Sequence, residues 1–191
     1  ESWEDLPYLL KKLKEIFSPA NMTLSISLWS PITHVIDDHY NIPKLYKHAD
    51  LVFVQFFGYH GSWEKSTDAF APLRNTKSQV PDKKYLTVEY SWNYMKKRGA
   101  VPCKTVMKIA MKSAEFRLKN KIPDTEGVVV PGDGLETVPG GGTMDFKQLC
   151  RMLREEKGWQ TEWDEEKRTP YMWREDRWVS YEDSRSVREK V

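Results

Sequence analysis

The sequence predicts an α/β fold in which a parallel sheet with helical crossovers is followed by a smaller α+β insertion. Helical and strand patterns alternate three times over residues 1–112, which is typical of parallel strands joined by right-handed crossovers. Residues 51–57 (LVFVQFF) form an unbroken apolar run, as in a strand that is buried on both faces. Beyond residue 113 the pattern changes to glycine- and proline-rich sequence and an aromatic hairpin.

The composition is that of an ordinary globular protein. The 191 residues suffice for one domain with a sizeable core, and 39% are hydrophobic and 30% charged. The net charge of +2 is spread along the chain, and no apolar stretch approaches the ~18 residues of a membrane span. We therefore expect neither nucleic acid nor membrane as a partner. The eight tryptophans and nine tyrosines suit either a core of large residues or a surface that stacks sugar rings.

The first two helix–strand units are predicted before residue 58. Apolar side chains from Trp3 to Phe17 recur at steps of three and four, which indicates an amphipathic helix. Residues 22–28 (MTLSISL) alternate apolar and small polar side chains, as in a strand. A short helical pattern at 43–48 then precedes the strand at 51–57.

The third unit consists of a helix at 85–98 and a strand at 105–111 (TVMKIAM). Val88, Trp92 and Met95 lie on one face of this helix, and Gly99 is suited to its C-terminal cap. Three such units cannot close a barrel by themselves, since a (β/α)₈ barrel needs about 250 residues. The chain therefore resembles the later part of a larger protein.

The insertion is predicted at residues 113–181. Its glycine- and proline-rich stretch ends in Gly140–Gly142, which we interpret as a turn, and a helix follows at 145–157. Residues 170–181 (PYMWREDRWVSY) indicate a hairpin around Glu175-Asp176, with Trp173 and Trp178 in the core of the insertion. Residues 184–191 are helical in pattern.

Several of these segments, in this order, resemble glycoside hydrolase family 18, the chitinases and chitinase-like lectins. The segments are HGSWEK (60–65), GGTMDFKQLC (141–150) and PYMWREDRWVSYED (170–183), with NMTLSISLWSP in the place of the family's fifth strand. The resemblance implies that residues 1–112 form about strands 5–7 of a TIM barrel with their helices. It also implies that 113–181 is the chitinase-type insertion and that 182–191 begins the next barrel helix.

The family's chemistry is implied by the same resemblance. Its enzymes use the substrate's own N-acetyl group as nucleophile, and a Glu that ends a DGxDxDxE motif acts as the acid. That motif occurs nowhere in this sequence, so we expect no catalytic residue in this chain and the acid to precede residue 1. The family's MxYD segment, whose Tyr and Asp polarise the acetamido group, corresponds to Gln55, Phe57 and Gly58. The hydroxyl and the carboxylate are therefore both missing.

Other residues near these strand ends are candidates for binding a sugar. Tyr59, His60 and Trp63 follow the strand, where aromatic rings suit stacking against a pyranose, although all three could instead be structural. Lys112 stands where the resemblance places an Arg, and it could equally be a solvated lysine. Glu115 is a weaker candidate for a replacement carboxylate.

We expect no cofactor and no metal site. The histidines at 34, 39 and 48 are scattered along the chain without ligand spacing, and Cys103 and Cys150 match no metal motif. Cys103 is expected to be a buried thiol, and the resemblance implies that Cys150 pairs with a cysteine outside this segment. Asn21-Met22-Thr23 is an acceptor sequence for N-glycosylation, which is used only in a secreted protein.

The preferred interpretation is a segment of a secreted, catalytically inactive chitinase-like protein that is monomeric when full-length. Its expected partner is chitin or a related N-acetylglucosamine oligosaccharide. One alternative is an active chitinase, an endo-hydrolase of β-1,4 links, whose catalytic Glu lies outside this segment. A second alternative is a growth-factor-like relative that binds a protein.

Overall fold

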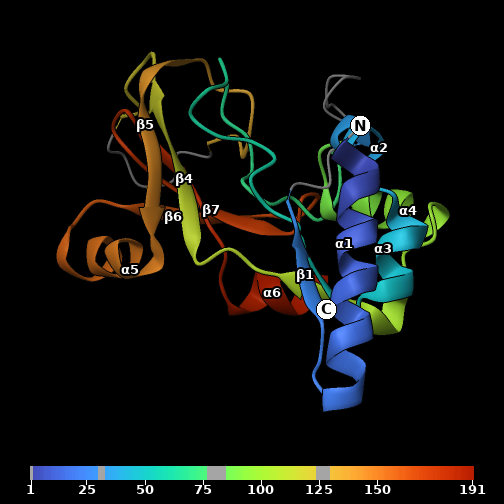
Figure 1. Cartoon of the computed structure of the whole chain (residues 1–191). Coiled ribbons are helices and arrows are strands. Elements are labelled where there is room, and N and C mark those ends of the chain that lie inside the picture. Colours follow the sequence, from blue (N-terminus) through green and yellow to red (C-terminus); the bar gives the residue numbers. More distant parts are fainter. Residues whose placement is uncertain (1, 30–32, 77–84, 124–129) are drawn as a thin grey trace. The chain divides into compact units, whose positions relative to one another are not determined.

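The computed structural model of the chain describes residues 2–29, 33–76, 85–123 and 130–191, without the side chains of 2–4 and 33–35 (Figure 1). It divides into two compact units. Unit 1 comprises Glu1–Phe56 with Glu89–Ile109, and unit 2 comprises Phe57–Val88 with Ala110–Val191. Among the described residues, no helix combines the length and the apolar character that crossing a membrane requires.

Unit 1 alternates helices with the strands of a parallel sheet, as the sequence predicts. Its elements are α1 (Ser2–Phe17), η1 (Ser18–Ala20), β1 (Ser25–Leu28), α2 (Thr33–His39), α3 (Ile42–His48), β2 (Leu51–Gln55), α4 (Val88–Lys97), η3 (Pro102–Lys104) and β3 (Thr105–Lys108). The strand order is β1-β2-β3, and both pairings are parallel. The predicted alternation is confirmed. Helix α2 was not predicted, because seven residues are too few to show a helical period.

The strands of unit 1 are shorter than predicted, and β2 is not buried on both faces. Val52 and Val54 are buried, whereas Leu51, Phe53 and Gln55 are half-buried. Period-2 alternation places these two sets on opposite faces of the sheet. The apolar run therefore identified the strand correctly but overstated the burial of its second face.

Helix α4 ends at Gly99, as the sequence predicts. Gly99 has a φ of +96°, and the backbone N–H groups of Gly99 and Ala100 donate to the carbonyl oxygens of Lys96 and Met95. This is the hydrogen-bond pattern of a Schellman motif, whose left-handed residue is best supplied by glycine. A Cβ at Gly99 would also lie 3.3 Å from Pro43 Cγ.

We expect Gly99→Ala to lower the free energy of unfolding of the intact protein by about 1–2 kcal/mol, because alanine is strained at this φ. Urea unfolding measures the change. Gly99→Asn is the matched control and should recover part of the loss, since asparagine tolerates the left-handed region better. An unchanged midpoint for Gly99→Ala would argue against this cap.

Unit 2 is built on an antiparallel sheet. Its elements are β4 (Lys112–Leu118), β5 (Thr137–Asp145), α5 (Phe146–Glu155), β6 (Gln160–Asp164), β7 (Thr169–Arg174), β8 (Arg177–Ser180) and α6 (Ser184–Lys190). The strand order is β5-β4-β8-β7-β6. The predicted hairpin is confirmed as β7–β8. Strand β6 was not predicted, because its sequence QTEWD is mostly polar and none of its residues is buried.

Gly140–Gly142 do not form a simple turn, so that prediction was wrong. They lie within β5, which pairs with β4 and shifts register between Phe116 and Arg117. All three glycines have positive φ, and a Cβ at Gly141 would lie 2.2 Å from the carbonyl oxygen of Glu115. The glycines therefore permit an irregular strand pairing that larger residues would block.

An aromatic cluster forms the core of unit 2. Trp173 and Trp178 are buried, as predicted, and the ring of Trp178 lies 5.4 Å from Tyr171 and 5.5 Å from Phe116. Trp178 pairs with Trp173 across the β7–β8 hairpin and with Phe116 across β4–β8. The aromatic side chains of the hairpin are therefore mainly part of the core.

Candidate functional site

The loop that follows residue 56 folds back on itself through backbone hydrogen bonds. The N–H groups of Gly58 and Tyr59 both donate to the carbonyl oxygen of Phe70, at 2.9 and 3.1 Å. The rings of Phe57 and Phe70 lie 5.9 Å apart, and Phe57 packs against the aromatic core. Gly58 has a φ of +80°, which glycine adopts without strain. We call residues 57–73 the Trp63 loop, after its exposed tryptophan.

Buried polar side chains stabilise the inside of the Trp63 loop. His60 is fully buried, with Nδ1 3.1 Å from both carboxylate oxygens of Glu64 and Nε2 3.7 Å from Asp68 Oδ2. Asp68 Oδ1 accepts a hydrogen bond of 2.7 Å from the backbone N–H of Ala69. The Trp63 loop therefore encloses the imidazole of His60 between the carboxylates of Glu64 and Asp68.

Lys167 connects this loop to two other segments of unit 2. Its Nζ is buried and lies 2.5 Å from Asp68 Oδ1 and 2.9 Å from Asp133 Oδ2. Burial alone would raise the pKa of Asp68, but His60, Lys167 and hydrogen bonds outweigh burial and lower it. One buried ammonium thus ties together the Trp63 loop, the segment before β5 and the β6–β7 turn.

Trp63 differs from the other aromatic side chains of its loop because its ring is exposed. The side chain is 65% exposed, and a Cβ at Gly61 would lie only 2.2 Å from the ring. The absent side chain at Gly61 is therefore what lets the indole lie against the backbone. An exposed, backbone-supported indole is suited to stacking against a flat apolar surface.

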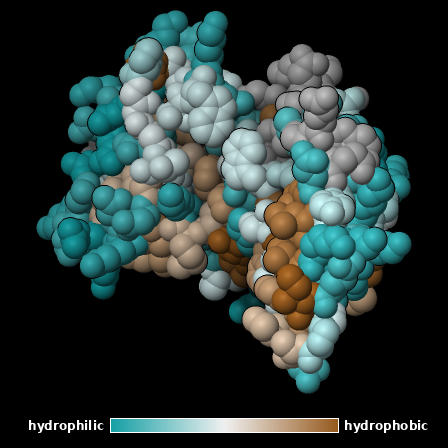
Figure 2. All heavy atoms as spheres, viewed as in Figure 1, coloured by the Kyte–Doolittle hydropathy of each residue, from teal (hydrophilic) through white to brown (hydrophobic). Residues whose placement is uncertain are grey.

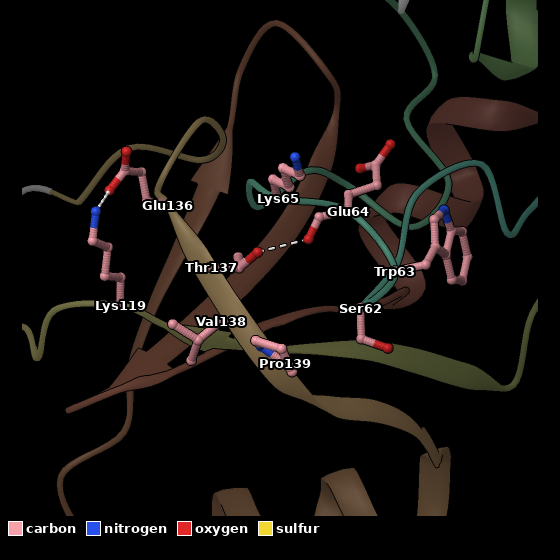
Figure 3. Close-up of a pocket in the computed structure, with 9 residues that line it drawn as sticks. All are labelled: Ser62, Trp63, Glu64, Lys65, Lys119, Glu136, Thr137, Val138 and Pro139. Atoms are coloured by element: carbon pink, nitrogen blue, oxygen red, sulfur yellow. Dashed lines mark hydrogen bonds and ion pairs between the residues drawn. The ribbon is translucent and has the colours of Figure 1, made fainter.

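A pocket of about 560 Å³ lies between the Trp63 loop and β5 (Figure 3). Thr137 connects its two sides, since its Oγ1 donates to the carbonyl oxygen of Glu64 and its N–H to that of Lys65. The exposed pair Lys119–Glu136 lies at one side of the pocket. The lining residues are Ser62, Trp63, Glu64, Lys65, Lys119, Glu136, Thr137, Val138 and Pro139. The pocket thus combines hydroxyl and charged groups with apolar surface, as small-molecule sites commonly do.

The profile of glycosyl hydrolases family 18 matches residues 2–191. The chain belongs to glycosyl hydrolase family 18. It is 33% identical to probable chitinase 10 of Drosophila melanogaster over 186 residues, which are 95% of this chain and 8% of that protein.

Solved structures agree with the fold of this family 18 chain. Catalytic domain 2 of the Ostrinia furnacalis group II chitinase matches with a TM-score of 0.83 and 27% identity, covering 98% of this chain and 49% of the other. A variant of that domain was solved with an N-acetylglucosamine oligosaccharide. Human YKL-39, described as a pseudo-chitinase that retains chitooligosaccharide binding, matches with a TM-score of 0.82 and 24% identity, over 97% of this chain and 52% of its own. The chain thus spans about half of these structures.

The structure brings some of the predicted binding residues of this family 18 chain together. Phe57, Gly58, Tyr59, His60 and Trp63 all lie in the Trp63 loop of unit 2. Lys112 is exposed at the start of β4 in unit 2, whereas Gln55 ends β2 in unit 1. Tyr59 and His60 are almost completely buried, so of the three loop candidates only Trp63 offers an open ring. Their roles in ligand binding stay predictions.

Asp68, Asp133 and Lys167 were not predicted from the sequence. None of them belongs to a recognisable motif, Lys167 lies within a run of charged residues (164–168), and their partnership depends on chain segments about 30–100 residues apart. A charged residue inside the mostly apolar stretch DAFAPL was the one available signal for Asp68. Glu115 accepts a hydrogen bond from Arg177 Nε, which gives it a structural partner.

The cysteines and possible metal ligands add no further site. Cys103 is exposed in η3, so the prediction of a buried thiol was wrong, because a polar helical turn on the surface carries it. Cys150 is half-buried in α5 with a free thiol. Within the described ranges, no three His, Cys, Asp or Glu side chains are grouped as metal ligands would be.

Proposed function

We propose that the protein containing this chain binds chitin-type N-acetylglucosamine oligosaccharides through this domain without cleaving them. The observation that carries the proposal is the replacement of the family's Tyr and Asp by Phe57 and Gly58. Phe57 packs against Phe70 and has no hydroxyl, and Gly58 has no side chain that could stabilise a charged intermediate. Binding depends on ring stacking and peripheral hydrogen bonds, which these two positions do not supply.

Trp63 is the residue to which we assign stacking against the sugar. It is the exposed ring of the loop, and it lines a pocket that also presents hydroxyl and charged groups. The oligosaccharide bound to the Ostrinia domain and the description of human YKL-39 support this class of ligand.

The test is calorimetric titration of a chitin tetrasaccharide into the intact protein and into its Trp63→Ala variant. We expect the variant to bind about tenfold more weakly, which corresponds to the loss of one aromatic contact. Tyr8→Ala on α1 is the matched control, because Tyr8 is 64% exposed and Trp63 is 65% exposed. Equal affinity in all three proteins would contradict the assignment to Trp63, and no binding by the intact protein would overturn the proposed function.

Secretion is part of the proposal and is supported by the acceptor sequence at Asn21. Asn21 is exposed at the C-terminal cap of η1, with a left-handed φ of +54°. Production in a eukaryotic secretory cell should give a mass shift that a glycan-removing enzyme reverses and that Asn21→Gln abolishes.

A further inference from the structure

An exposed ion pair borders the same pocket as Trp63. Lys119 Nζ lies 2.6 Å from Glu136 Oε2, and the two side chains are 58% and 67% exposed. Figure 3 shows the pair and Trp63 on opposite sides of the pocket, with Val138 and Pro139 between them. A ligand that stacks on Trp63 and extends along the pocket therefore reaches Lys119 and Glu136.

The fold does not need this ion pair to hold the two backbone segments together. The N–H of Lys119 already donates to the carbonyl oxygen of Glu136, and Leu118 pairs with Thr137 in the β4–β5 ladder. Figure 2 shows mainly hydrophilic surface at this end of unit 2, where β4 ends and β5 begins. Exposed ion pairs add little to stability, because water screens their charges. The two side chains are therefore available to a ligand.

The pair presents a hydrogen-bond donor beside an acceptor. The hydrogen bond between the two side chains raises the pKa of Lys119 and lowers the pKa of Glu136, so both are charged at neutral pH. The ammonium has three N–H groups and the carboxylate has two oxygens, so each can make further hydrogen bonds outside the pair. Val138 adds exposed apolar surface next to them.

An acetamido group matches this arrangement, whereas simple ions do not. Its carbonyl oxygen accepts, its N–H donates and its methyl group is apolar. A sulfate or phosphate group offers acceptors alone and is repelled by Glu136, and an ammonium group offers donors alone and is repelled by Lys119. A hydroxyl carries both roles on one oxygen but brings no methyl group to Val138. The pair therefore favours a neutral amide.

We propose that Lys119 and Glu136 select for the N-acetyl group of the oligosaccharide. Lys119 donates to the acetamido carbonyl oxygen, Glu136 accepts from the acetamido N–H, and the methyl group contacts Val138. This role rests on the proposed function and makes its ligand more specific. Phe57 and Gly58 lack the groups with which the family contacts the acetamido group, so the pair supplies this selectivity from a different position.

The test compares a chitin tetrasaccharide with cellotetraose, which carries a hydroxyl in place of each acetamido group, by calorimetric titration into the intact protein at neutral pH. The parent should bind the chitin tetrasaccharide at least about tenfold more tightly, which corresponds to one hydrogen bond to a charged group. The double variant Lys119→Ala, Glu136→Ala keeps the net charge. It should bind the chitin tetrasaccharide about tenfold more weakly and cellotetraose as the parent does.

The matched control is the double variant Lys121→Ala, Glu175→Ala. It removes another exposed Lys–Glu pair of unit 2, and neither residue lines the pocket. This control should bind both tetrasaccharides as the parent does. A second variant, Lys119→Glu with Glu136→Lys, keeps an ion pair between the two segments but exchanges donor and acceptor. Its preference for the chitin tetrasaccharide should fall.

Three outcomes would overturn this selectivity. Equal losses of affinity for both tetrasaccharides in the alanine variant of Lys119 and Glu136 would show that the pair does not recognise the acetamido group. Tighter binding of the fully deacetylated tetrasaccharide than of the chitin tetrasaccharide would assign the pair to an ammonium ligand. Unchanged selectivity in the exchange variant would show that the pair serves only the fold.

Failure of this inference is distinguishable from failure of the proposed function. Binding of the chitin tetrasaccharide that depends on Trp63 but not on Lys119 and Glu136 would overturn the role of the pair alone. The absence of binding by the parent would overturn the proposed function as well.

Discussion

We expect this domain of the intact protein to hydrolyse chitin oligosaccharides at less than about one ten-thousandth of the rate of an active family 18 enzyme. The loss of one positioned donor at a developing charge typically costs about 10²–10³ in rate, and Phe57 and Gly58 represent two such losses. Release of product from a chitin tetrasaccharide is the measurement. Turnover that disappears when Trp63 is replaced would show that this domain cleaves its ligand, and it would overturn the proposed function.

The reverse experiment introduces the missing groups through Phe57→Tyr combined with Gly58→Asp. Gain of turnover would support the proposal, although the structure identifies two obstacles. Phe57 packs against Phe70 in an apolar cluster, and Gly58 has a φ of +80°. Aspartate is among the residues that tolerate this region best, but some strain is expected. The single variant Phe57→Tyr is therefore the control, because it restores the hydroxyl without introducing strain at residue 58.

Replacement of the buried lysine should have the largest effect on stability. Lys167→Met removes the buried ammonium that Asp68 and Asp133 share, and the removal of one partner from a buried ion pair typically costs about 3–5 kcal/mol. Urea unfolding of the intact protein measures this loss. The control is Lys119→Met, which breaks the exposed pair with Glu136 and should change stability little. Similar midpoints for the two variants would mean that the buried pair is not stabilising.

Lys167→Met should also change how the free energy of unfolding depends on pH. In the parent the pKa of Asp68 is lowered, so its contribution is present above the unfolded value of about 4 and is lost as pH falls through the lower folded value. Without Lys167, burial acts on Asp68 with less opposition, and protonation relieves the buried charge. The difference in unfolding free energy between parent and Lys167→Met should therefore shrink as pH falls toward 4. A difference that grows on acidification would contradict this account.

Periodicity was sufficient to predict most of the fold. Burial gives neighbouring residues a recognisable pattern of apolar side chains. Such a pattern is present in the amphipathic helices, in β2 and in the aromatic hairpin. The short helix α2 was missed because seven residues are too few to show a helical period, and the polar strand β6 was missed because none of its residues is buried. The glycines of β5 were misread, since a bulge and a turn need the same backbone freedom.

Some features of the candidate site could be predicted from the sequence, and others became evident only in the structure. The sequence alone determined the family resemblance, the absent hydroxyl and carboxylate at Phe57 and Gly58, and the place of Trp63 after a strand. Only the tertiary structure decided that Trp63 is exposed while Tyr59 and His60 are buried, and that Lys167 neutralises Asp68 from a distant turn. Local sequence patterns indicate which side chains of a segment are buried. Exposure and charge pairing in a loop depend on segments that meet only after the chain has folded.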